Sequence, residues 1–156
     1  MTNNNIPNLE ILSLLQTGLI EKANNLLNYY YYLEGKVLHG NKQGRKIGFP
    51  TLNLKFITKK PFILKIGCYV TLTQIKNQNY FGLTCVLQAK TTNDILCENW
   101  LQDFSQNVYG QNVKIYFLRF YRKNVIFSSL KQIQNLIKND VKELKKKPKI
   151  NKKMLK

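Results

Sequence analysis

The sequence predicts a mainly β domain, an antiparallel barrel with a helical hairpin before it and one helix after it. Hydrophobic and polar residues alternate along the middle of the chain, which is the pattern of half-buried strands. No helical periodicity separates these strands, which favours a barrel over a doubly wound parallel sheet. Helical periodicity is confined to the two ends, and a length of 156 residues fits one compact domain.

The first predicted element is a helical hairpin over residues 8–28. Apolar residues recur there at intervals of three and four, and Gly18 separates the two halves. These residues are Leu9, Leu12, Leu15, Leu19, Ala23 and Leu26. The tyrosine run over residues 29–32 favours extended structure. We therefore assign residues 1–30 to a helical segment and start the barrel at residue 31.

The strands of the barrel follow. Residues 68–73 and 81–87 alternate with a period of two, and Asn77 and Asn79 between them are typical of a tight connection. Further strands are expected around residues 33–39, 95–103 and 112–121.

One amphipathic helix closes the domain. Apolar residues from Leu130 to Leu144 are spaced 3-4-4-3, and Ser128 and Ser129 can cap the start of the helix. We expect the barrel and this helix to occupy residues 31–144. Residues 145–156, KKKPKINKKMLK, show no apolar period and contain a proline, which predicts a basic disordered tail.

The formal net charge of +17 raises nucleic acid, an acidic membrane surface or a phosphorylated small molecule as partners. However, 22 of the 25 basic residues are lysine, which is less diagnostic of base reading or paired phosphate binding than arginine. Eight of the lysines lie from residue 142 onward. The charge alone therefore does not identify the partner.

The cysteines and the N-terminal residues indicate the cellular compartment in which the protein is expected. Cys68, Cys85 and Cys97 are odd in number and show no short paired spacing, and His39 is the single histidine. This pattern argues against a zinc site or a disulfide framework and predicts reduced, mostly buried thiols. No apolar run approaches the length of a membrane span, and the polar start lacks the order of a secretory signal. We expect a cytoplasmic monomer with no membrane partner.

The segment over residues 33–54 carries the strongest chemical pattern. It holds four of the eight glycines, and Lys42, Arg45 and Lys46 are interleaved with Gly40, Gly44 and Gly48. Glycine lets backbone N–H groups approach a ligand, so the loop has the donors and the cations of a phosphate cradle. It matches neither the Walker motif nor a dinucleotide fingerprint. An ordinary hairpin connection is the alternative interpretation.

Two oxygen-bearing residues follow this loop. Thr51 and Asn53 point to the same side of an extended chain, and two neutral oxygen ligands leave room for the waters and phosphates that usually complete a Mg²⁺ shell. A side-chain-capped turn is the alternative interpretation. A kinase acting on an alcohol also needs a group that takes the hydroxyl proton. Glu98, in the middle of a predicted strand, is the candidate, although it could equally be a structural ion-pair partner.

Three segments resemble the riboflavin kinase family. GKVLHGNKQGRKIGFPTLNL resembles its signature, a Gly-x-Val-x-x-Gly start followed by Gly-Arg-x-x-Gly-Phe-Pro-Thr-x-Asn. ENWLQDFSQNVYG resembles the stretch around its catalytic glutamate, and RFYRKNVIFSSLKQIQNLIKND resembles its closing segment. Residues 8–32 are similar to the connector that precedes the kinase module in bacterial enzymes that also carry an FMN adenylyltransferase. The resemblance covers about residues 8–141.

The resemblance implies a six-stranded Greek-key barrel that transfers the γ-phosphate of ATP to the terminal ribityl hydroxyl of riboflavin, giving FMN. It makes Glu98 the base and Thr51 and Asn53 the ligands of Mg²⁺ or another divalent metal. Arg122 and Phe127 would flank the flavin. The residues implied in nucleotide binding are Gly40, Lys42, Gly44, Arg45, Lys46, Gly48, Thr51 and Asn53. No adenylyltransferase motif is present, so FAD synthesis is not expected from this chain.

The chain also departs from the family pattern. CVLQAKTT, from Cys85 to Thr92, stands where the family usually has Asn-Ile-Gly-x-Arg-Pro-Thr. Trp100 stands where histidine is frequent, Leu52 replaces the usual alanine, and Lys123 or Asn124 replaces an acidic residue. Because the implied metal ligands and base remain, an active but diverged kinase is favoured. The alternatives are a catalytically weak or silent flavin-binding remnant and a basic barrel that binds nucleic acid non-specifically.

Overall fold

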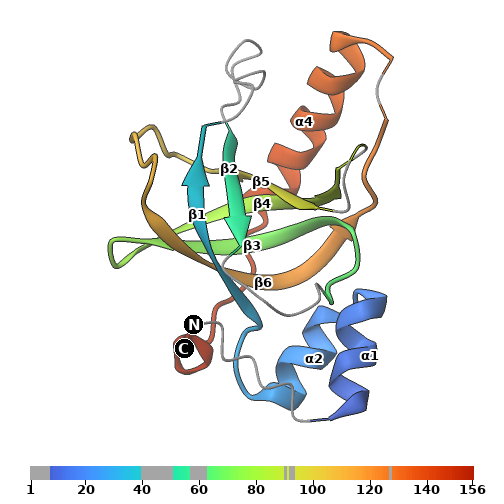
Figure 1. Ribbon diagram of the computed structural model, residues 1–156, viewed down its shortest axis with the longest axis vertical. Helices are drawn as coiled ribbons and strands as arrows, with labels where there is room; N and C mark the ends of the chain where they lie inside the picture. Colours follow the sequence, from blue (N-terminus) through green and yellow to red (C-terminus); the bar gives the residue numbers. More distant parts are fainter. Residues whose placement is uncertain (1–7, 40–50, 57–62, 90, 92–93, 127) are drawn as a thin grey trace.

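Six antiparallel strands close into a barrel in the computed structural model (Figure 1). The structure describes residues 8–39, 51–56, 63–89, 91, 94–126 and 128–156. The strands are β1 (Tyr32–Leu38), β2 (Thr51–Phe56), β3 (Gly67–Ile75), β4 (Gln78–Gln88), β5 (Ile95–Leu101) and β6 (Asn112–Arg122). Around the barrel they follow the order β1-β2-β5-β4-β3-β6. Strands β3, β4 and β5 are successive neighbours and β6 returns beside β3, which is a Greek key. The predicted fold class is confirmed.

Alternation along the strands separates an inner from an outer face. Residues such as Val37, Leu54, Val86 and Ile115 point into the barrel and form its apolar core. A buried polar network also lies inside. In it, Thr71 shares a hydrogen bond of 2.8 Å with Thr84, and the Asn99 amide donates to Thr73 at 2.8 Å; Thr84 donates to Asn99 at 3.3 Å. Every member is paired, as buried polar groups require.

The predicted helical hairpin closes one end of the barrel (Figure 1). Helix α1 (Leu9–Thr17) begins where the Asn8 side chain accepts from the Ile11 N–H at 2.9 Å, and it ends at Gly18, whose φ is 82°. Helix α2 (Ile20–Leu27) is fixed to the barrel through buried Asn24. Its amide donates to the Phe117 carbonyl at 2.9 Å and accepts from the Tyr31 N–H at 2.7 Å.

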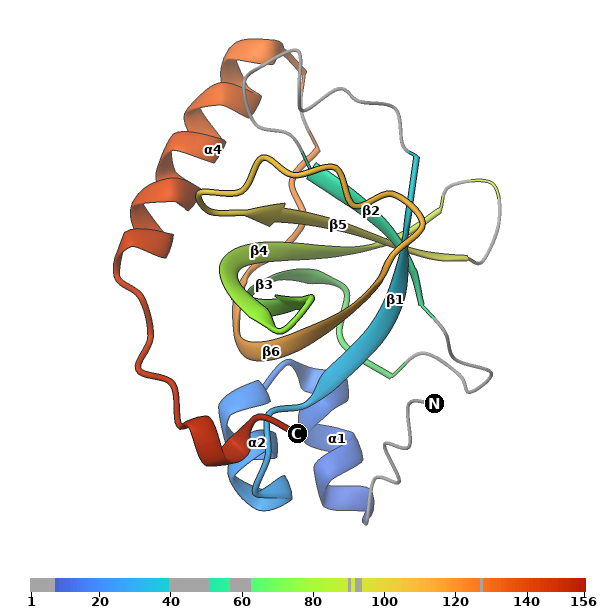
Figure 2. The same ribbon diagram turned by 90° about the vertical axis from the view of Figure 1, so that its left-hand side faces the viewer.

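The predicted C-terminal helix is α4 (Leu130–Lys145), which runs along the side of the barrel (Figure 2). Its side-chain cap is Ser129, which accepts from the Gln132 N–H at 3.3 Å. Two ion pairs join the C-terminal half of α4 to β6. Arg122 binds Asp140, and Arg119 binds Glu143.

The C-terminal segment differs from the predicted disordered tail over residues 145–156. It packs back on the barrel and forms a short helix, η1 (Lys152–Met154). The Met154 carbonyl accepts from the Tyr30 N–H at 3.0 Å, and the Lys156 carbonyl accepts from the Tyr116 hydroxyl at 2.6 Å. Apolar Ile150 and Leu155 contact a cluster on the outer face. The sequence did not predict this packing, because Ile150 and Leu155 are two isolated apolar residues among lysines and show no periodic spacing.

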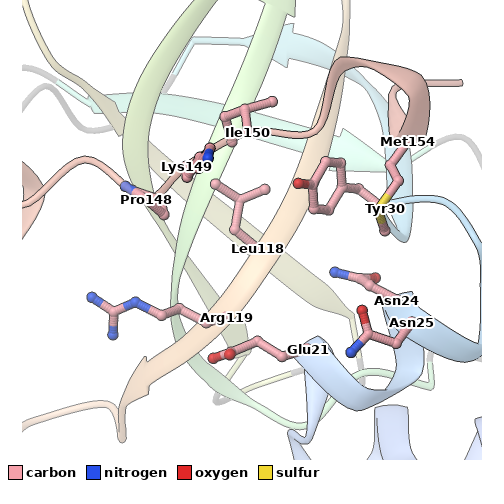
Figure 3. A pocket seen from close by; sticks show the side chains of 10 residues that line it. All are labelled: Glu21, Asn24, Asn25, Tyr30, Leu118, Arg119, Pro148, Lys149, Ile150 and Met154. Atoms are coloured by element: carbon pink, nitrogen blue, oxygen red, sulfur yellow. The ribbon is translucent and has the colours of Figure 1, made fainter.

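The C-terminal segment also walls a cavity of about 240 Å³ against α2 and β6 (Figure 3). Its lining combines polar and charged residues such as Glu21, Arg119 and Lys149 with apolar residues such as Leu118 and Ile150. The Arg119 guanidinium is already paired with Glu143. None of the predicted site residues that the structure describes lines this cavity.

The cysteines correct one prediction. Cys97 is a free, buried thiol as expected, but Cys68 and Cys85 form a disulfide between β3 and β4. The spacing of 17 residues does not by itself indicate a bond. The register of the β3–β4 hairpin places the two cysteines opposite each other, with their Cα atoms 4.0 Å apart.

No helix in the described part of the chain is long and apolar enough to cross a membrane.

Candidate active site

The candidate site lies on the outer face of the barrel, where β2 pairs with β5. Asn53 of β2 is directly opposite Glu98 of β5, and Thr51 is opposite Trp100. Side chains that face each other across an antiparallel pair have Cβ atoms roughly 5 Å apart. The pairing of β2 with β5 therefore brings together Thr51, Asn53 and Glu98, although Thr51 and Glu98 are 47 residues apart in the sequence.

The alternation of each strand explains why these side chains point outward. On β2, Leu54 is 3% exposed and occupies the core, so Thr51 and Asn53 take the opposite face. On β5, Cys97 and Asn99 are buried inside the barrel, so Glu98 points out. A shift of either strand by one residue would send these polar groups into the core.

Close approach of β4 supports the position of β5. Gly82 lies directly against Trp100, and a Cβ at Gly82 would collide with the Trp100 carbonyl oxygen. Glycine at this position therefore allows β4 and β5 to pair closely at the end of β5 that carries Trp100.

Partial desolvation gives Glu98 an altered proton affinity. Although its side chain remains exposed, the surrounding protein raises the pKa of the Glu98 carboxyl above its usual range. Within the described residues, no hydrogen bond or ion pair engages the side chains of Thr51, Asn53 or Glu98. A more basic carboxylate with no competing partner is suited to accept a proton from a substrate hydroxyl.

The donor set is also suited to a hard cation. A hydroxyl, an amide and a carboxylate oxygen share one face, and oxygen is the donor that Mg²⁺ prefers. The described residues contain no group of three His, Cys, Asp or Glu side chains that could enclose a metal. A cation at Thr51 and Asn53 would therefore complete its coordination with waters or substrate oxygens.

The site continues as a row across the outer face. From Glu98 it runs to Cys85 on β4, Cys68 on β3 and Arg122 on β6, each opposite the next. The Arg122 guanidinium donates to both carboxylate oxygens of Asp140 on α4. Its Nε lies 3.0 Å from Oδ1, and its Nη2 lies 2.7 Å from Oδ2. This fork holds α4 at the edge of the row.

The N-terminal half of α4 presents an apolar surface near this edge. Leu130 is 66% exposed, and Ile133, Leu136 and Ile137 are only half-buried. Figure 1 shows this half of α4 projecting past the barrel at the end where β1 stops and β2 starts. It is therefore available to cover a flat apolar ligand.

Several predicted site residues lie outside the described part of the chain. They are Gly40, Lys42, Gly44, Arg45, Lys46, Gly48 and Phe127. The described end of β1 carries a feature that the sequence did not reveal, a stack of His39 on Tyr109 with ring centroids 3.9 Å apart. The partnership of Arg122 with Asp140 was also missed, since only the fold brings the two residues together.

The comparisons with known proteins bear on the family and the fold. The family model described as riboflavin kinase (Flavokinase) matches residues 27–147. A bifunctional riboflavin kinase/FMN adenylyltransferase from Mycoplasma pneumoniae is 35% identical over 134 residues, which cover 85% of this chain and 48% of that protein. The chain thus spans about half the length of the curated relatives it matches first.

Solved structures show the same fold. A crystal structure described as a macrolide-efflux protein from Streptococcus pneumoniae aligns with a TM-score of 0.84 at 29% identity, covering 92% of this chain and 47% of that chain. A riboflavin kinase from Trypanosoma brucei aligns with a TM-score of 0.51 at 25% identity, covering 75% and 80%. On the family match, the chain belongs to the riboflavin kinase family.

Proposed function

We propose that this chain is a riboflavin kinase, which transfers the γ-phosphate of ATP to the terminal ribityl hydroxyl of riboflavin and yields FMN and ADP. The observation that carries this proposal is the meeting of Thr51, Asn53 and Glu98 on one outward face, in a chain of this family.

Glu98 supplies the base. Its carboxylate takes the proton of the ribityl hydroxyl while that oxygen forms a bond to the γ-phosphorus. The bond from the γ-phosphorus to the bridging oxygen breaks, and ADP leaves with the electron pair. The raised pKa of Glu98 makes it a better proton acceptor than an ordinary surface carboxylate.

Thr51 and Asn53 would hold a divalent metal, and their oxygen donors fit Mg²⁺. When bound, the metal neutralises charge on the transferred phosphate. The nucleotide-binding role of Gly40, Lys42, Gly44, Arg45, Lys46 and Gly48 remains a prediction from the sequence. Since this loop directly precedes Thr51, it would deliver backbone N–H groups and cations beside the metal ligands.

The flavin is placed against the apolar half of α4. Leu130, Ile133 and Ile137 offer a surface for the isoalloxazine ring, and Phe127 is proposed to add to it. Arg122 acts as a positioning residue, because both oxygens of Asp140 already engage its guanidinium.

The test is formation of FMN by the purified chain with riboflavin, ATP and Mg²⁺. Replacing Glu98 with Gln keeps the shape of the side chain and removes its basicity, so we expect the rate to fall by about 10²- to 10⁴-fold. Glu10→Gln, the same chemical change on exposed α1, is the matched control and should leave the rate unchanged.

Other outcomes would select the alternatives. Flavin binding without FMN formation by the unaltered chain would identify a silent remnant. Binding to single-stranded nucleic acid that weakens steeply with salt, with no flavin binding, would favour a basic nucleic-acid-binding barrel. Full activity of Glu98→Gln would remove Glu98 from the role of base.

A further inference from the structure

The disulfide lies in the middle of the candidate active site. In the row across the outer face, Cys85 is directly opposite Glu98, and Cys68 is directly opposite Arg122. The Cys68–Cys85 bond therefore separates the proposed base from the residue that anchors α4. No step of the proposed phosphoryl transfer uses either sulfur atom.

The two sulfur atoms differ in access. Cys68 is 1% exposed, whereas Cys85 is half-buried. An incoming thiolate can approach only the more exposed sulfur, so attack is directed to Cys85 Sγ and the leaving group is Cys68. The remaining cysteine, Cys97, is buried on the inner face, where desolvation raises the pKa of its thiol and keeps it unreactive.

The hydrogen bonding of Asn124 depends on whether Cys68 is a thiol or part of the disulfide. The Cys68 sulfur lies 3.4 Å from Asn124 Oδ1, a distance at which a thiol donates a hydrogen bond. A disulfide sulfur carries no proton, so this bond exists only after reduction. The Asn124 amide also donates to the Val86 carbonyl at 2.9 Å. Asn124 thus ties the chain between β6 and α4 to the barrel, with one tie or two according to the state of Cys68.

We propose that Cys68–Cys85 is a site of reversible thiol–disulfide exchange that adjusts riboflavin binding through Asn124. The consequence for riboflavin rests on the proposed kinase function; the exchange itself does not. In the reduced form both ties hold the segment that precedes α4, and the flavin surface is better ordered. In the disulfide form only the tie to Val86 remains.

The exchange uses a low-molecular-mass thiol such as glutathione. Its thiolate bonds to Cys85 Sγ, and the Cys68–Cys85 bond breaks with the electron pair leaving on Cys68 Sγ, which takes a proton from water. A second thiolate attacks the glutathione sulfur of the mixed disulfide and releases glutathione disulfide; Cys85 leaves as a thiolate and is protonated. Two thiols are oxidised as the protein disulfide is reduced.

The fold tolerates both states. Strands β3 and β4 remain joined by nine residue pairs of the hairpin whether or not the sulfur atoms are bonded. The expected effect of exchange is therefore local to the row and to the segment after β6.

The first experiment measures the exchange itself on the full chain. The disulfide form is treated with glutathione under native conditions, then alkylated with iodoacetamide and mapped by mass spectrometry. We expect the glutathione mixed disulfide to form on Cys85 and not on Cys68. Once reduction is complete, iodoacetamide should label the more exposed Cys85 before the buried Cys68, while Cys97 stays unlabelled. Absence of labelling at Cys85 in the folded protein would overturn the proposal, whatever the catalytic activity.

The second experiment measures riboflavin binding by quenching of its fluorescence, which needs no turnover. We expect the reduced form to bind riboflavin about 2- to 10-fold more tightly, the size of one hydrogen bond. The same shift should appear in the KM for riboflavin, with kcat and the KM for ATP unchanged. Equal riboflavin affinity in the two forms, or none in either, would overturn the proposal.

Three variants separate the causes. Asn124→Ala removes both ties and should bind riboflavin equally in both redox states, with an affinity no higher than that of the unaltered disulfide form. Cys85→Ser keeps the Cys68 thiol beside Asn124 and should bind with the affinity of the reduced form, insensitive to oxidant. Cys97→Ala, the matched control, should retain the full redox response. A redox response that persists in Asn124→Ala would contradict the proposed route. Lack of FMN formation in every form, with redox-dependent quenching intact, would instead count against the kinase function alone.

Discussion

The desolvation of Glu98 costs folding free energy but favours its role as a base. Its side chain points outward between Asn53 and Cys85, yet the surrounding protein raises the pKa of its carboxyl. Desolvation penalises the charged form, so ionised Glu98 costs folding free energy. The same penalty strengthens its attraction for a proton from a bound alcohol.

The pH dependence of Glu98 follows from this shift. Catalysis needs the ionised carboxylate, so the rate of FMN formation should rise with pH through an apparent pKa above the usual value near about 4.3. Because the pKa of Glu98 is raised in the folded state, the folded protein binds this proton more tightly than the unfolded chain does. The stability from the protonated form is therefore lost as pH rises through the folded-state pKa. Glu98→Gln should therefore unfold at equal or higher urea concentration than the unaltered chain at pH 7. A lower unfolding midpoint for Glu98→Gln at pH 7 would contradict this assignment.

At the scale of elements, the anchoring of α4 rests on two arginines of β6. In the described part of the chain, two ion pairs fix the C-terminal half of the helix to the barrel, Arg122 with Asp140 and Arg119 with Glu143. The N-terminal half carries the exposed apolar residues near the site. The two ion pairs thus set the position from which these apolar residues face the site.

We expect Asp140→Asn to weaken this anchor. Asp140 is 5% exposed and binds Arg122 through both oxygens, so the change leaves a guanidinium with a poorer partner. The free energy of unfolding in urea should fall by about 1.5–3 kcal/mol. Lys142→Ala, on the exposed side of the same helix, should change it by less than about 0.5 kcal/mol. Equal effects of the two changes would mean that the ion pair does not anchor α4.

The elements show how far sequence reasoning reaches. The alternation of residues 68–73 and 81–87 and the spacing from Leu130 to Leu144 predicted their strands and helix, since local period reports burial directly. The spacing of Thr51 and Asn53 predicted that they share a face. It could not show that the face meets Glu98, because that depends on the pairing of β2 with β5. The Cys68–Cys85 bond and the Asp140 partner were missed for the same reason.

At the scale of the whole molecule, the net charge of +17 is distributed differently from what the sequence suggested. Eight lysines from residue 142 onward belong to a helix end and a segment that packs on the barrel. Apolar Ile150 and Leu155 hold that segment against the outer cluster. The lysines are thus displayed on a fixed surface.

Removal of residues 149–156 should consequently destabilise the protein. The deletion exposes the outer cluster and removes the hydrogen bonds of Met154 and Lys156 to Tyr30 and Tyr116. We expect a loss of about 2–4 kcal/mol in the free energy of unfolding, from the burial of two aliphatic side chains. Changing Lys152 and Lys153 to Gln in the full-length chain removes charge without these anchors and is the control. An unchanged urea midpoint after deletion would mean that the segment adds nothing to the fold.

The order β1-β2-β5-β4-β3-β6 also has a kinetic consequence. Asn53 and Glu98 meet only when β2 pairs with β5, and the whole β3–β4 hairpin lies between these two strands in the sequence. Closing a loop of this length is slow compared with forming local hairpins. A refolding chain should therefore gain the backbone signal of β3 and β4 before it gains any capacity to bind substrate, and the catalytic face is among the last surfaces to exist.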